Sequence, residues 1–238
     1  MKGADHDLTD GRIDAGSDGE EALEAKDGDF GLDRGDSRLS VKELESQYPE
    51  IKNFGNCDYI TEEEIRQSLD TLPESHREHV ISKVERISYV DEERFDENGD
   101  RIYGRTYHPE GKDKVCIEIY KHDNKKSAEL TLNHEYAHIE YPTLSPEQQE
   151  GYYRLYKRGG LDEEISPEIN KAYPEDARPE EDFCESYAHY RVTPERLARK
   201  SPYKYNFMKY QVFEGKGYMH PVDESRLLHG TRRVEENE

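Results

Sequence analysis

The residues most able to do chemistry are five in a row, His134-Glu135-Tyr136-Ala137-His138. An α-helix advances about 3.6 residues per turn, so His134 and His138 project from one face, where two imidazoles can bind one zinc ion. Glu135 is then well placed to take a proton from zinc-bound water, whose pKa the metal lowers toward neutrality. The pentapeptide therefore predicts a site with one zinc ion per chain that supplies both a nucleophile and a general base.

An alternative interpretation of the same pentapeptide is a surface helix with two solvated histidines. The neighbouring residues argue against it, because they would pack one side of the helix into the protein. These residues are Ala128, Leu130, Leu132 and Ile139, and Ala137 is small where a zinc site is crowded. The zinc interpretation is therefore favoured.

A catalytic zinc also needs a third protein ligand and one open position. The metzincin pattern would place a glycine at position 141 and a histidine at position 144. The chain has Tyr141 and Leu144 there, so the metzincin class is excluded. The third ligand has to come from farther along the chain.

The better source of a third ligand is a later predicted helix that carries Glu181 and Glu185 one turn apart on one face. Glu181 can ligate the zinc, while Glu185 accepts the outer ring N–H of a zinc-bound histidine and so sets its tautomer. Both could also be ordinary solvated carboxylates, because the chain is rich in them. His189, two turns beyond Glu181, is a rival ligand.

The segments that position these residues follow from hydrophobic periodicity and turn signals. The expected strands are residues 86–90, 102–107 and 114–120, with a tight turn at Asn98-Gly99. Five helices are expected at residues 76–84, 126–141, 146–158, 180–191 and 203–213. Two more are expected to begin at Thr61 and at Pro194. Short strands followed by helices predict an α+β domain, with a small three-stranded sheet and a mostly helical half that carries the zinc site.

Composition divides the chain and limits its partners. Residues 1–40 hold twelve acidic and five basic residues and a single aromatic, which predicts a disordered arm because little apolar surface offsets the ordering entropy. Residues 41–213 are the expected folded domain, and residues 214–238 a polar tail. The net charge of −21 argues against binding to nucleic acid or to an anionic membrane, since both would repel the protein. Such acidity is typical of solubilising tails or of a halophilic origin.

Location and redox state follow from apolar runs and cysteine spacing. The sequence has no run of about 18 apolar residues, so no membrane-spanning helix is expected, and no secretory signal is recognised at its start. Cys57, Cys116 and Cys184 are widely spaced, which predicts reduced thiols. These features predict a cytoplasmic protein, and a virion-associated one is the alternative.

Three segments together resemble the catalytic domain of anthrax lethal factor and its phage- and toxin-associated relatives. They are HEYAH at 134–138, EEDFCESYAHY at 180–190 and KSPYKYNFM at 200–208. The resemblance covers residues 60–213 and implies a zincin-like fold and a gluzincin peptidase, with Glu181 as third zinc ligand and Glu185 behind a histidine. It also implies that Tyr173 steadies the oxyanion and that residues 114–120 form the cleft edge where an extended peptide pairs. Cys184 takes the place of the alanine that is usual in the family.

The main hypothesis is a zinc-dependent endopeptidase that hydrolyses peptide bonds of a protein substrate, with basic or unfolded segments favoured by the acidic charge. An alternative is a virion or assembly component that keeps a zincin fold, such as a phage or archaeal-virus head protein or maturation protease. The phage relatives motivate it, as does the acidic arm, which partner proteins would have to order. A toxin or antirepressor-cleaving peptidase that acts on one cellular protein is the third hypothesis.

Overall fold

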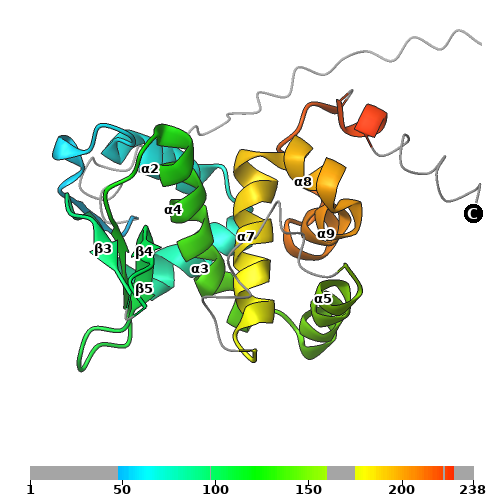
Figure 1. The fold of residues 1–238 in the computed structure, drawn as a ribbon, viewed down its shortest axis with the longest axis horizontal. Coiled ribbons are helices and arrows are strands. Elements are labelled where there is room, and N and C mark those ends of the chain that lie inside the picture. The colour runs from blue at the N-terminus through cyan, green and yellow to red at the C-terminus, as the bar shows by residue number, and fades with distance from the viewer. Residues whose placement is uncertain (1–47, 97, 160–174, 222, 228–238) are drawn as a thin grey trace, which may run out of the picture. The chain divides into compact units, whose positions relative to one another are not determined.

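The structure is a computed structural model that describes residues 48–96, 98–159, 175–221 and 223–227, all within one compact unit, Leu39–Glu238. The arm expected at 1–40, Tyr173, and residues 228–238 of the expected tail lie outside the described residues. The described chain is mixed α+β, with a small sheet and a mostly helical half, as predicted (Figure 1).

The main sheet has four strands in the order β1-β2-β6-β5, namely β1 (Glu50–Lys52), β2 (Val84–Tyr89), β6 (Val115–Ile119) and β5 (Gly104–Tyr107). Strands β1, β2 and β6 are parallel, and β5 is antiparallel to β6. The expectation of three strands is therefore wrong by one. Strand β1 is only three residues long, and its sequence EIK has too little apolar alternation to be recognised.

A separate hairpin precedes β5. It pairs β3 (Arg94–Phe95) with β4 (Arg101–Ile102), and the predicted turn lies between them. Gly99 in this turn has a φ of 85°, which glycine adopts without strain. The single strand expected at 102–107 is thus divided between the hairpin and the main sheet.

The strand order also corrects the expected cleft edge. Strand β6, which covers the strand predicted at 114–120, has a neighbour on each side, so its backbone groups are already paired. The edge strand beside it is β5, whose outer N–H and C=O groups have no partner strand in the described residues. Periodicity identifies a strand but not its neighbours, because strand order depends on long-range pairing.

The helices lie close to the predicted segments. Thr61 caps the first one with a capping box, in which Thr61 Oγ1 accepts from the Glu64 N–H at 3.2 Å and Glu64 Oε2 accepts from the Thr61 N–H at 2.8 Å. The single helix expected at 203–213 is a short α-helix followed by a π-helical turn, Met208–Val212. The α-helices are α2 (Glu62–Asp70), α3 (Glu74–Lys83), α4 (Lys125–Glu140), α5 (Pro146–Gly159), α7 (Arg178–Val192), α8 (Pro194–Lys200) and α9 (Pro202–Phe207).

The helical half is organised around α4 and α7, which pack side by side (Figure 1). They are antiparallel, because Asn133 in α4 contacts Arg191 near the end of α7, whereas His138 contacts Glu180 near its beginning. Helix α4 also packs on β5 and β6, so it links the sheet to α7. The buried side chains at these contacts include Leu132, Tyr136, Phe183 and Tyr187.

A buried ion pair holds α7 against the helices around it. Lys204 Nζ on α9 lies 2.7 Å from Asp182 Oδ1, and the two side chains are only 2% and 0% exposed. The Tyr152 hydroxyl on α5 donates to Asp182 Oδ2 at 2.7 Å. Asp182 therefore connects α5, α7 and α9 with charge-assisted hydrogen bonds, which limit how far α7 can slide or rotate.

The packed core continues into the segment expected to be a polar tail. Tyr218 lies edge-on to Phe213 with ring centroids 5.5 Å apart, and Met219 is buried. Residues 223–227 are helical. Within the described residues no helix is long and apolar enough to cross a membrane.

Candidate metal centre

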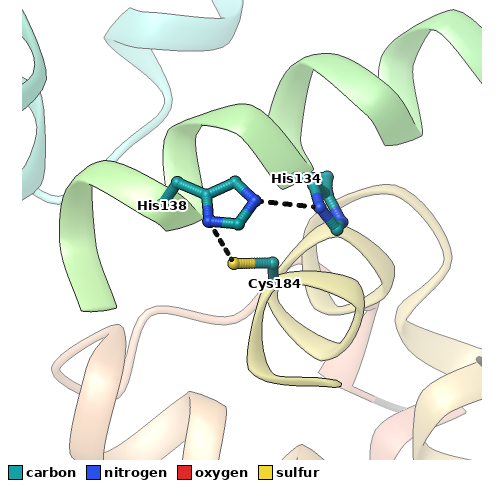
Figure 2. A group of neighbouring side chains, drawn as sticks. All are labelled: His134, His138 and Cys184. Atoms are coloured by element: carbon teal, nitrogen blue, oxygen red, sulfur yellow. Dashed lines mark hydrogen bonds between the residues drawn. The ribbon is translucent and has the colours of Figure 1, made fainter. Parts of the chain in front are cut away.

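Histidines of α4 and acidic residues of α7 meet between the two helices. Figure 2 shows His134 and His138 side by side on α4, with the thiol of Cys184 facing them from α7. Because the helices are antiparallel, side chains one turn apart on α4 meet side chains one turn apart on α7 in reverse order. The fold therefore brings four residues predicted from the sequence to one place: His134, His138, Glu181 and Glu185.

Three of these side chains place ligand atoms around one point. The Nε2 atoms of His134 and His138 are 3.2 Å apart. Glu181 reaches both rings, with Oε2 3.3 Å from His134 Nε2 and Oε1 3.8 Å from His138 Nε2. Two ligand atoms bound about 2.1 Å from one tetrahedral zinc ion lie about 3.4 Å apart. The two nitrogens and the carboxylate thus have separations that fit a shared zinc ion.

The hydrogen bonding within the cluster is incomplete. Glu181 Oε2 and His134 Nδ1 are both buried, and neither forms a hydrogen bond within the described residues. Their contacts of 3.3 Å lack hydrogen-bond geometry. Unpaired buried polar atoms are costly, so these atoms call for a further partner. A cation bound to the two Nε2 atoms would supply one for Glu181 Oε2, whereas His134 Nδ1 faces Glu185.

Each imidazole also has a carboxylate on its other nitrogen. Glu185 Oε1 lies 3.3 Å from His134 Nδ1, at the position predicted for it. Glu180 Oε1 lies 3.1 Å from His138 Nδ1 and accepts its hydrogen bond when Nδ1 is protonated. A carboxylate beside Nδ1 favours the tautomer that presents Nε2 to a metal.

Glu180 was missed by the sequence analysis. The signal was present, because Glu180 precedes Glu181 directly in an acidic helix start. However, the role of Glu180 depends on which imidazole lies beside it, and the antiparallel packing of α4 and α7 determines that. An adjacent carboxylate in an acidic chain gives no such information on its own.

The carboxylates change the pKa values of the cluster. Burial opposes the charged form of His134, but Glu181 and Glu185 outweigh it and raise the pKa of the imidazole well above its usual range. Burial alone would raise the pKa of Glu185, yet His134, together with His189 and Arg196, lowers it.

Cys184 is the other candidate for the third ligand. His134, His138 and Cys184 have ligand atoms within 4.8 Å of one another, close enough to hold a metal ion. However, the Cys184 sulfur contacts His138 at Nδ1, 3.5 Å away, and not at the Nε2 atom that faces His134 (Figure 2). Burial and the surrounding carboxylates raise the pKa of the thiol well above its usual range. Glu181 is therefore the better third ligand.

Glu135 lies beside the cluster and faces the sheet. It is 5% exposed, and its Oε2 accepts a hydrogen bond from Thr106 Oγ1 on β5 at 2.8 Å. Burial raises the pKa of the Glu135 carboxyl, and His134 and His138 act in the opposite direction. A buried carboxyl with a raised pKa next to metal-binding groups is typical of a general base.

The remaining predicted site residues are not part of this cluster. His189, the rival ligand, has its Nδ1 2.5 Å from Thr193 Oγ1, so that ring nitrogen is already engaged by the end of its own helix. Tyr173, the expected oxyanion-stabilising residue, lies outside the described residues.

No protein-family model matches the chain, and a search of curated proteins found no match. The functional assignment therefore rests on the geometry of the site.

Proposed function

We propose that this protein is a zinc endopeptidase of the gluzincin type with a zincin-like fold. His134, His138 and Glu181 would hold one zinc ion per chain. The observation that carries the proposal is the arrangement of the two Nε2 atoms and the Glu181 carboxylate between α4 and α7, with separations from 3.2 to 3.8 Å.

The protein's own residues then have distinct tasks. Zinc, when bound, would activate a water molecule and polarise the carbonyl of the peptide bond to be cut. Glu135 takes the proton from the attacking water and delivers it to the leaving amine. The burial of Glu135 beside the ligands supports this role. Glu180 and Glu185 orient the imidazoles through their Nδ1 atoms.

The free edge of β5 is where an extended substrate would pair. It is the edge strand of the sheet, and its residue Thr106 contacts Glu135. A peptide that adds a strand to this edge is held by main-chain hydrogen bonds, so it can be recognised with little dependence on its sequence. The acidic charge of the chain favours basic or unfolded segments.

Removal of the metal is expected to abolish peptidase activity, and zinc alone is expected to restore it. The purified protein should contain one zinc ion per chain by elemental analysis. Cleavage of a basic, unfolded protein should be mapped by mass spectrometry before dialysis against a chelator, after it, and after zinc is added back. Protein without stoichiometric zinc, or cleavage that persists in the metal-free protein, would contradict the proposal.

The change Glu180→Gln is expected to weaken zinc binding. Loss of a carboxylate behind a metal-bound histidine typically costs about 10- to 100-fold in affinity. The lower end is expected here, because 40% of the Glu180 side chain is exposed and water competes with it. Zinc affinity is measured by competition with a chelator, with Glu147→Gln on the exposed surface of α5 as the matched control. Equal affinities in the two variants would show that Glu180 does not support the site.

A further inference from the structure

Two residues of β5 lie directly against the carboxylate of Glu135. Gly104 and Thr106 are two positions apart, so they point to the same face of the sheet, and they pair with Ile119 and Ile117 of β6. This face packs on α4. Strand β5 thus contributes an alternating pair of residues to the surroundings of Glu135.

The first contact is a hydrogen bond. Thr106 Oγ1 lies 2.8 Å from Glu135 Oε2 and also 3.4 Å from the backbone oxygen of Glu135. The carboxylate accepts and the hydroxyl donates. A carboxylate that is 5% exposed has lost most of its water, so a donor of this kind stabilises its ionised form and holds its orientation.

The second contact is a close approach of the backbone at Gly104. A Cβ atom at this position would lie 2.9 Å from Glu135 Oε1 and 2.5 Å from Thr131 Cγ2. Both separations are shorter than the contacts that Cβ atoms make in proteins. A side chain at position 104 would therefore require Glu135 and Thr131 to move. The two carboxylate oxygens are therefore both against β5, one beside Thr106 and the other beside Gly104.

We propose that Thr106 is a positioning residue for Glu135, whose hydroxyl holds the carboxylate of the general base against the edge strand that receives the peptide. The inference rests on the proposed peptidase function. It assigns to β5 a second task besides pairing with substrate. Because one strand would contact both the peptide and the base, a peptide seated on β5 would be held at a set distance from the Glu135 carboxylate.

The alternative is that Thr106 only packs, as β-branched residues commonly do in half-buried strands. The change Thr106→Val keeps the shape and removes the hydroxyl, whereas Thr106→Ser keeps the hydroxyl and removes a methyl group. If Thr106 positions the base, kcat should fall roughly 10- to 100-fold in Thr106→Val, as expected for a lost hydrogen bond to a charged group. KM and zinc content should stay close to wild type, and Thr106→Ser should retain most of kcat.

A second measurement needs neither zinc nor substrate. The thermal midpoint of the metal-free protein is compared for wild type, Thr106→Val, Glu135→Ala and the double variant. The contact predicts that Thr106→Val lowers the midpoint in the wild-type background and has little further effect once Glu135 is alanine. An equal shift in both backgrounds would mean that the hydroxyl does not act on Glu135 and would overturn the inference.

The two proposals fail in different ways. A wild-type protein that binds no zinc and cuts no peptide would end the proposed function and, with it, the role of Thr106. An active wild type with an unchanged kcat in Thr106→Val would overturn the inference about Thr106 alone.

Discussion

The change Glu135→Gln is expected to lower kcat for peptide hydrolysis by about 10²- to 10⁴-fold, the usual contribution of a general acid–base residue. Glutamine has nearly the same shape as glutamate and can still accept the hydrogen bond from Thr106, but it cannot take a proton from water. Zinc content should therefore stay at one ion per chain. Cleavage rates are measured on a substrate whose cut sites have been mapped with the wild-type protein.

The matched control is Glu129→Gln. Glu129 lies on the same helix, where it faces Lys125 and the side chains of a surface hollow, and it is not among the side chains of the metal cluster. Undiminished hydrolysis in Glu135→Gln would exclude Glu135 as the base. If the wild type cuts nothing and Glu135→Gln is still incorporated stably into a particle, the virion-component hypothesis would replace the peptidase.

The change Glu181→Ala is expected to remove zinc from the purified protein, whereas Cys184→Ala is expected to retain it. The reason is the direction from which each group approaches. Glu181 reaches the Nε2 side of both imidazoles, whereas the Cys184 sulfur lies by Nδ1 of His138. A zinc site left with two histidines binds far more weakly, since a catalytic site uses three protein ligands. Elemental analysis after dialysis measures the difference.

Cobalt substitution gives an independent measurement of whether Glu181 or Cys184 is the third metal ligand. A Co²⁺ ion bound by two histidines and a carboxylate lacks the near-ultraviolet absorption that a thiolate ligand produces, so the wild-type spectrum should show none. A strong thiolate absorption that disappears in Cys184→Ala, with metal retained in Glu181→Ala, would contradict the gluzincin proposal. The ligands would then be His134, His138 and Cys184.

Much of the local structure could be predicted because its causes are local. The helical period places His134 and His138 one turn apart on one face of α4. In the same way it places Glu181 and Glu185 one turn apart on one face of α7. Thr61 begins α2 because its hydroxyl and the Glu64 side chain satisfy backbone N–H groups within one turn. These pairs are three or four residues apart, so a short stretch of sequence contains the whole interaction.

The sheet was predicted less well because its causes are not local. The apolar alternation of residues 115–119 identifies β6 as a strand, but its position between β2 and β5 depends on backbone pairing with segments far along the chain. For this reason the edge strand is β5 and not β6. Strand β1 is defined almost entirely by its parallel pairing with β2.

The HEYAH pentapeptide and the acidic helix after it determined which residue types could bind zinc, because helix geometry alone sets their spacing. Only the tertiary structure decided which atoms meet. The antiparallel packing of α4 and α7 directs Glu181 to the Nε2 atoms, and it gives each imidazole its own carboxylate, Glu185 or Glu180. The packing of β5 on α4 brings Thr106 to Glu135. Contacts between distant segments depend on how whole helices and strands pack, and no short stretch of sequence specifies that.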